Sequence, residues 1–196
     1  MAIGISLDMG HWKLDIAPSR GLASWRFMKD NLKIILFPLV IIGILFGSAG
    51  RWDLPFFWAL MAIFMIQIVV GLWVMDPDLR KERVRPAPGG IHRHLRWMVM
   101  PFFIAHWVIA GLDVGRFHWS DTVPPAVQSG GLVGMAATMG LAAWAVSVNR
   151  FFSPVVRIQE ERGHHLVTTG PYQFIRHPGY FAGMSMGRCS SLVLGS

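Results

Sequence analysis

The sequence predicts an all-α protein, a multi-pass transmembrane helical bundle of about four spans plus an incomplete fifth. Hydrophobic residues make up 53% of the 196 residues, with 9 Trp and 13 Phe among them, and the mean hydropathy is +0.45. Soluble domains of this length carry fewer apolar and more charged residues. Several long stretches also lack charged residues, and a helix of about 20 apolar residues crosses the ~30 Å hydrocarbon core of a bilayer.

The first two predicted spans are the most apolar. Residues 34–50 carry no charge, and residues 34–46 read IILFPLVIIGILF. The second uncharged run, 54–75, has Trp58 and Trp73 toward its two ends. Because tryptophan favours the membrane interface, this placement supports a complete crossing.

Three further apolar stretches follow. Residues 97–112 are short for a crossing and contain Pro101 and His106, so a buried or re-entrant helix is an alternative to a third span. Residues 127–148 are rich in Gly and Ala, which suits close helix packing, and they predict the fourth span. Residues 180–196 are too short to cross by themselves.

The basic residues predict the orientation of this bundle. With four crossings, fifteen of the 18 Lys and Arg residues fall on one side of the membrane, against Arg51 and Arg116 on the other. The positive-inside rule places the N-terminus and these basic segments in the cytoplasm. The fifteen are Lys13, Arg20, Arg26, Lys29, Lys33, Arg80, Lys81, Arg83, Arg85, Arg93, Arg96, Arg150, Arg157, Arg162 and Arg176.

This orientation also accounts for the net charge of +7. The basic loop, residues 76–97, is expected to contact anionic membrane lipids. Nucleic acid is not an expected partner, because no stacking platform or reading helix accompanies the basic residues.

The predicted organisation has three parts. Residues 1–33 form a cytoplasmic or interfacial N-terminal segment that lacks the pattern of a signal peptide. Residues 34–148 hold the transmembrane helices and the basic loop, and residues 149–196 hold a candidate binding segment and the start of a final helical region. The single cysteine, Cys189, excludes an internal disulfide and a cysteine-rich metal site, and no metal site is expected.

The richest chemistry lies in residues 149–180, where His, Arg, Tyr, Gly and Pro gather beside a span. Charges at helical spacing over 157–162 predict a solvated helical face that Gly163 ends. Residues 166–169 predict a short extended piece, and a helical turn over 172–176 is expected after the Gly-Pro turn.

The end of this stretch predicts a compact, stiff loop. Pro178 biases His177 away from helical conformation, and Gly179 allows a tight bend before a helix that starts at Tyr180. Taken singly, these side chains have ordinary interpretations. Tyr172 and Tyr180 suit interfacial anchors, and His177 suits a contact with lipid phosphate.

Together the residues form a specific pattern. The pattern G-P-Y-x-x-x-R-H-P-x-Y over residues 170–180, preceded by H-x-L-V-T-T over 164–169, resembles the signature of the isoprenylcysteine carboxyl methyltransferase and phospholipid methyltransferase family of integral membrane enzymes. DPDLRKERVRP, residues 76–86, resembles the loop after the second span in bacterial members. The resemblance extends over about the last two thirds of the chain.

The resemblance implies an S-adenosylmethionine-dependent methyltransferase with a cytoplasm-facing cofactor pocket. The implied acceptor is lipophilic, such as an isoprenylcysteine carboxylate, a phospholipid amine or a related small lipid, and it enters between the helices. Arg176 supplies a basic group that can pair with the carboxylate of the cofactor's amino acid tail. No catalytic residue is assigned. The cofactor-binding residues expected here are His164, His165, Leu166, Val167, Tyr172, Arg176, His177, Pro178, Gly179 and Tyr180.

Members of this family continue beyond the point where this chain ends. They carry a further helix pair and a C-terminal stretch with an Arg for the acceptor and a Glu for the cofactor. This chain ends at Ser196, and Arg188 stands in its last apolar stretch, where an unpaired charge is costly. A partial sequence is therefore expected.

Two other classes remain as alternatives. A NADPH-dependent membrane sterol-type reductase has a related architecture, and cofactor dependence separates it from a methyltransferase. A non-enzymatic multi-pass membrane protein is suggested by His106 and Asp113. These two are expected to be a packed polar residue and a helix-end charge, because transport predicts paired ionisable groups deep in several spans. The G-x-G-x-x-G turn of a Rossmann-type methyltransferase is absent.

Overall fold

The computed structural model describes residues 3–8, 11–16, 36–84, 95–120 and 122–196. The chain divides into two compact units, Met1–Phe37 and Pro38–Ser196. Most of the predicted N-terminal segment 1–33 and residues 85–94 of the basic loop lie outside the described residues.

The first unit contains a β-hairpin. Strand β1 (Ile3–Asp8) pairs with β2 (His11–Ile16) in antiparallel register, with Ile3 opposite Ile16 and Asp8 opposite His11. Among the described residues, this hairpin is the departure from the all-helical prediction. Its physical basis is in the sequence, because IGISLD and HWKLDI contain the alternation of apolar and polar residues that suits a strand.

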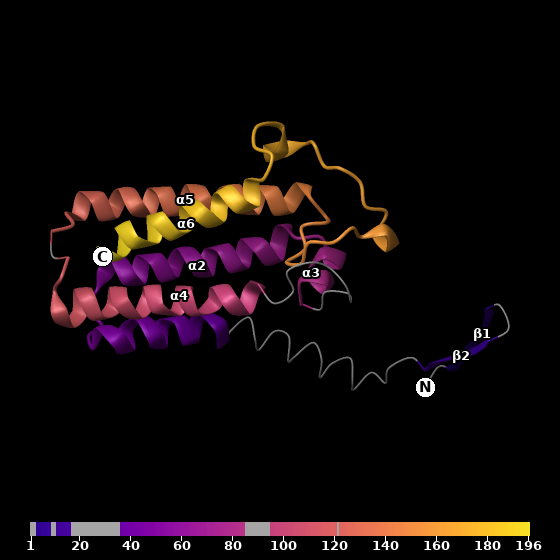
Figure 1. Ribbon diagram of the computed structural model, residues 1–196, viewed down its shortest axis with the longest axis horizontal. Coiled ribbons are helices and arrows are strands. Elements are labelled where there is room, and N and C mark those ends of the chain that lie inside the picture. The colour runs from indigo at the N-terminus through magenta and orange to yellow at the C-terminus, as the bar shows by residue number, and fades with distance from the viewer. Residues whose placement is uncertain (1–2, 9–10, 17–35, 85–94, 121) are drawn as a thin grey trace. The chain divides into compact units, whose positions relative to one another are not determined.

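The second unit is a helical bundle (Figure 1). Its long helices are Leu36–Ala49, α2 (Pro55–Val74), α4 (Leu95–Leu112), α5 (Pro125–Val148) and α6 (Pro178–Leu194). The shorter elements are α3 (Pro77–Val84), the π-helical turn η1 (Asp113–Phe117), and the 3-10 turns η2 (Glu160–Arg162) and η3 (Gly170–Gln173). This bundle confirms the predicted fold class.

Three of these helical segments are long and apolar enough to cross a membrane: Pro55–Val74, Met98–Phe117 and Pro125–Val148. Turn η1 continues α4 and lengthens its apolar segment to 20 residues. The alternative of a short re-entrant helix is therefore not needed for the third predicted span. The helix Leu36–Ala49 is shorter over its described residues.

One core holds the bundle together. Its fully buried members include Leu45, Phe46, Phe57, Leu60 and Met135, which come from three different helices. Large apolar side chains also cover the outside, because Trp73 is 86% exposed and Phe102 is 76% exposed. An apolar exterior of this kind suits lipid as the surrounding solvent.

Glycines allow the helices to approach closely. A Cβ built on Gly131 would lie 2.9 Å from the backbone nitrogen of Val193, and one built on Gly134 would lie 2.8 Å from Cys189 Sγ. Because the backbone of Val193 cannot turn aside, a side chain at position 131 would push α5 and α6 apart, whereas one at position 134 would displace the Cys189 thiol. The close packing expected for residues 127–148 is confirmed at these two positions.

A polar pair joins α4 to α6. His106 Nε2 lies 2.8 Å from the Ser190 hydroxyl, which donates in turn to the Gly187 carbonyl at 2.9 Å. Asp113, at the end of α4, is buried and accepts the backbone N–H of Ser120 at 2.9 Å. The interpretation of His106 as a packed polar residue and of Asp113 as a helix-end charge is confirmed.

Candidate functional site

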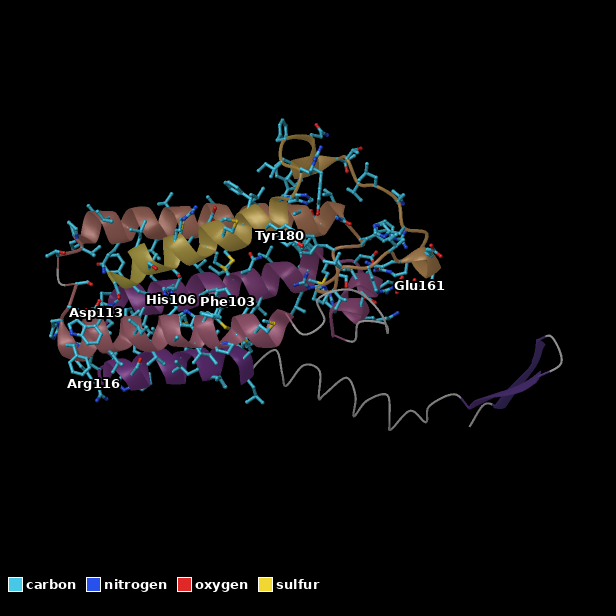
Figure 2. All side chains as sticks on the ribbon, viewed as in Figure 1. Phe103, His106, Asp113, Arg116, Glu161 and Tyr180 are labelled. Carbon is cyan, nitrogen blue, oxygen red and sulfur yellow. The ribbon has the colours of Figure 1, made fainter. Side chains whose placement is uncertain are left out.

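Seven of the ten predicted site residues lie in the connection from α5 to α6, and the other three, Pro178, Gly179 and Tyr180, begin α6. All lie at the end of the bundle that also carries α3 (Figure 1). Figure 2 shows Glu161 of this connection at one end and Asp113 and Arg116 at the opposite end. The helix order dictates this placement, because α2, α5 and the start of α6 all meet there.

The turn after α5, residues 149–152, contacts side chains from several other segments of the site. The Asn149 side chain accepts the N–H of Phe151 at 2.9 Å, which bends the chain sharply as the helix ends. The carbonyls of Arg150, Phe151 and Phe152 then accept side-chain hydrogen bonds, respectively from Arg162 at 2.7 Å, Gln159 at 2.8 Å and Arg83 at 3.2 Å. Side chains thus satisfy carbonyls of the turn beyond α5, where no helical partner is available.

Both predicted histidines contact Phe151. The His164 ring stacks on Phe151 at 4.7 Å between centroids, and the His165 ring meets it edge-on at 5.0 Å. The backbone N–H of Gln159 donates to His164 Nδ1 at 3.1 Å. A neutral His164 ring that accepts at Nδ1 carries its proton on Nε2, which leaves that N–H available as a donor.

Tyr172 is attached to the same turn. Asn149 Nδ2 donates to the Tyr172 hydroxyl at 2.8 Å. Burial raises the pKa of Tyr172, and the hydrogen bond from Asn149 opposes that rise only in part, so the phenol stays neutral at physiological pH. Turn η3 packs closely on α5, because a Cβ on Gly170 would lie 3.1 Å from Trp144 Nε1 and from Val148, and Gly170 adopts φ +61.

The third group surrounds the start of α6. His177 has φ −130 and ψ 69, outside the helical region as predicted. Its ring lies 5.7 Å from the ring of Tyr180, which is 65% exposed. Leu166 is 84% exposed, Val167 is half-buried, and Arg176 is exposed.

The predicted bend at Gly179 is wrong. Helix α6 starts at Pro178, two residues earlier than expected, because proline suits the first helical position. Gly179 instead provides room, since a Cβ there would lie 2.5 Å from Phe152 Cζ.

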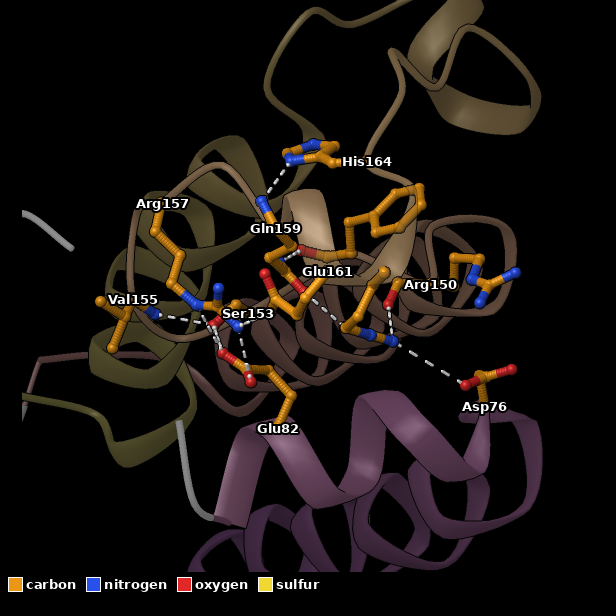
Figure 3. Close-up of polar contacts among 11 residues, drawn as sticks. Asp76, Glu82, Arg150, Ser153, Val155, Arg157, Gln159, Glu161 and His164 are labelled. Atoms are coloured by element: carbon orange, nitrogen blue, oxygen red, sulfur yellow. Dashed lines mark hydrogen bonds and ion pairs between the residues drawn. The ribbon is translucent and has the colours of Figure 1, made fainter. Parts of the chain in front are cut away.

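The predicted helical face over 157–162 is also wrong. Only Glu160–Arg162 form a single 3-10 turn, which Gly163 ends at φ +64. Arg157 is not on a solvated face: its side chain is 9% exposed and pairs with Glu82 of α3 as well as with Glu161 (Figure 3). Long-range pairing with α3 overrides the local helical spacing, because it gives a buried guanidinium a carboxylate partner.

The charges in this network shift the pKa values of its members. The hydrogen bond to Glu161, followed by the one to Glu82, raises the pKa of Arg157. The hydrogen bond from Arg157 lowers the pKa of Glu161 below its usual range. Arg157 and Glu161 are therefore both charged near neutral pH.

One comparison with known proteins identifies this part of the chain. Residues 132–194 match the model of the isoprenylcysteine carboxyl methyltransferase (ICMT) family. Over these residues the chain is similar to this family. The matched residues are about a third of the chain, and they run from α5 through the whole connection into α6.

The ICMT family is a family of membrane methyltransferases. The match to it and the three apolar segments together support an integral membrane protein. The match is narrower than the predicted resemblance, which included residues 76–86. No curated protein and no solved structure matches the chain.

The ICMT segment brings three of the ten predicted residues onto the turn after α5. His164 and His165 contact Phe151, and Tyr172 contacts Asn149. Sequence reasoning missed Asn149, Phe151 and Phe152 as the residues that organise the site. Their position in the sequence was the signal that could have found the two phenylalanines. Two adjacent aromatic residues directly after a predicted span are expected to pack against other residues rather than to face water.

Sequence reasoning also missed two residues outside or beside the predicted pattern, Glu82 and Gln159. Gln159 is 1% exposed and Glu82 is 7% exposed. Among the described residues, no group of three or more His, Cys, Asp and Glu side chains is placed to hold a metal ion.

Proposed function

We propose that this chain is an S-adenosylmethionine-dependent methyltransferase that acts on a lipophilic acceptor at the cytoplasmic membrane face. The observation that carries the proposal is the ICMT family match over residues 132–194, which contain all ten predicted cofactor-binding residues. Methyltransferases of this family use S-adenosylmethionine in general.

The residues present fit this cofactor by their chemistry. The Nε2–H of His164 is a free donor for an adenine nitrogen or a ribose oxygen. The exposed rings of His177 and Tyr180 offer faces for a cationic sulfonium. The exposed guanidinium of Arg176 suits the carboxylate of an amino acid tail.

When bound, the cofactor supplies a methyl group on a cationic sulfur. The residues of this chain then have to bind, align and shield, since the reaction is a direct displacement that requires no protein nucleophile. Phe151 and Asn149 hold the ring of His164 and the hydroxyl of Tyr172 in fixed positions. The acceptor is a prenylated cysteine carboxylate, a phospholipid amine or a related small lipid, which reaches the site from the apolar exterior.

The cytoplasmic orientation rests on charge. The described basic residues at the α3 end include Arg80, Lys81, Arg83, Arg150, Arg157, Arg162 and Arg176, whereas Arg51 and Arg116 lie at the opposite end. The positive-inside rule assigns the α3 end to the cytoplasm.

The test is binding of S-adenosylmethionine to the detergent-purified chain by calorimetry, with His177→Ala as the variant and His106→Ala as the control. His177→Ala is expected to weaken binding about tenfold through loss of a ring contact. His106→Ala should change binding much less, because His106 contacts Ser190 inside the bundle. Equal losses contradict the site, and binding of NADPH in place of S-adenosylmethionine favours the reductase alternative.

A further inference from the structure

Helix α3, which lies outside the matched ICMT segment, is joined to the site by a buried ion pair. Arg157 donates from Nε to Glu82 Oε1 at 3.1 Å and from Nη2 to Glu82 Oε2 at 3.0 Å. The two side chains are only 9% and 7% exposed. A two-contact pair with this burial fixes both the distance and the relative orientation of the two segments.

Two further groups complete this pair. The Ser153 hydroxyl donates to Glu82 Oε1 at 3.1 Å, and Arg157 Nη2 also donates to Glu161 Oε1 at 2.6 Å (Figure 3). Arg157 therefore lies between a buried carboxylate from α3 and an exposed carboxylate from its own segment. Of these two carboxylates only Glu82 comes from another element, so it is the one that links Arg157 to α3.

Other contacts attach α3 along its length. Arg83 donates to the Phe152 carbonyl at 3.2 Å, and its guanidinium carbon lies 5.6 Å from the centre of the Phe152 ring. Asp76 accepts the backbone N–H groups of Asp78 and Leu79 at the start of α3 and lies 4.0 Å from Arg162. The helix is thus both capped and attached to the site segment by the same carboxylate.

The attached segment is the one that presents the histidines. Arg157 precedes Gln159 by two residues, and Gln159 donates its backbone N–H to His164 and its side-chain amide to the Phe151 carbonyl. Displacement of Arg157 therefore moves the group that orients the His164 ring.

We propose that Glu82 is a positioning residue: through Arg157 it holds the segment carrying His164 and His165 against α3, so that cofactor affinity depends on a helix outside the matched family segment. This proposal rests on the proposed function for the identity of the cofactor. The attachment of this segment to α3 through Glu82 and Arg157 does not depend on the identity of the cofactor, and it can be measured without one.

The first measurement needs no ligand. Trypsin cleaves after arginine, and Arg157 is protected by burial and by its two carboxylate partners. Glu82→Gln keeps the size of the side chain but removes its charge, and it should speed cleavage after Arg157 roughly tenfold as the segment opens. The matched control is Asp53→Asn, which neutralises the partner of Arg51 in an exposed pair at the opposite end and should leave cleavage after Arg157 unchanged. Equal cleavage of wild type and Glu82→Gln overturns the proposal.

The second measurement is calorimetric binding of S-adenosylmethionine to wild type, Glu82→Gln, Arg157→Gln and the double variant. Each single variant should bind at least tenfold more weakly, since a small displacement of binding groups is enough for such a loss. The double variant should bind no more weakly than the weaker single variant, because both changes remove the same contact. Additive losses, or wild-type affinity in Glu82→Gln, overturn the positioning role. If wild type itself does not bind, the proposed function fails, while the cleavage result still decides whether Glu82 holds the segment.

Discussion

At one end of the bundle an ion pair lies in solvent, and at the other an ion pair of the same geometry is buried. Arg51 and Asp53 form contacts of 2.7 and 2.6 Å with side chains 42% and 70% exposed. Arg157 and Glu82 form contacts of 3.1 and 3.0 Å with side chains 9% and 7% exposed. Distance alone would rank the exposed pair as the stronger. Burial reverses the expected cost of breaking each pair, because water screens the exposed charges, whereas removal of one partner from a buried pair leaves an uncompensated charge.

The connections between helices also differ between the two ends, because they are short at the Arg51 end and long at the α3 end. At the Arg51 end, residues 50–54 join the helix Leu36–Ala49 to α2 by a short turn. At the α3 end, residues 149–177 form a long connection with only two 3-10 turns. Side chains therefore have to satisfy its backbone, as Arg162, Gln159 and Arg83 do for three consecutive carbonyls. Such a connection holds its shape only while those side chains remain in place.

The largest expected effect compares the two arginines. Arg157→Gln removes a charged partner of the buried Glu82 carboxylate, and we expect a loss of about 3 kcal/mol in the free energy of unfolding. Arg51→Gln breaks an exposed pair and should leave the thermal midpoint in detergent unchanged. Similar shifts in the two midpoints would show that burial does not separate the pairs.

A smaller effect compares two glycines. A Cβ on Gly115 would lie 2.2 Å from the Ala49 carbonyl oxygen and 2.4 Å from its Cα, whereas a Cβ on Gly179 meets the Phe152 ring. Backbone cannot move aside as a ring can, so Gly115→Ala should cost about 2 kcal/mol and Gly179→Ala less than half of that.

Thermal unfolding of the two alanine variants gives this comparison directly. If the phenyl ring has no room to turn, Gly179→Ala will be as destabilising as Gly115→Ala, and Gly179 will have to be counted with the rigid contacts of the core.

The smallest effect concerns a single hydrogen bond. Tyr172→Phe removes the acceptor for Asn149 Nδ2 and should cost about 1 kcal/mol or less, confined to the connection. Amide hydrogen exchange over residues 170–176 measures this local loss. Ser147→Ala is the control, because the Ser147 hydroxyl bonds only within its own helix, to the Trp144 carbonyl at 2.9 Å. Equal exchange in the two variants would mean that η3 is held by its packing on α5 rather than by Tyr172.

The sequence predicts the helical bundle well, because apolar runs such as 54–75 are sufficient to define spans in lipid. It also predicts the non-helical His177, since that conformation depends on the next residue alone. The helical face at 157–162 could not be corrected from local spacing. The partner that overrides it, Glu82, is 75 residues away along the chain.

The hairpin shows a different reason for error. Apolar residues alternate with polar residues or glycine at Ile3, Ile5 and Leu7, as in a strand. The apolar composition of the chain as a whole favours membrane helices, and it outweighed this local pattern in the prediction. In the candidate site, the residues that form a recognisable pattern were found. The residues that position them were not, because Phe151 and Gln159 act through packing and backbone hydrogen bonds that no motif records.

Glu82 lies outside residues 132–194, and this limits how the site can be transplanted. A graft of that segment into another helical bundle would carry the Arg157 guanidinium with Glu161 but without the buried carboxylate of Glu82. Removal of one member of a buried ion pair is strongly destabilising. The smallest transferable unit of this site is therefore discontinuous: residues 76–84 have to accompany residues 132–194, and the recipient has to hold both at the same end of its helices.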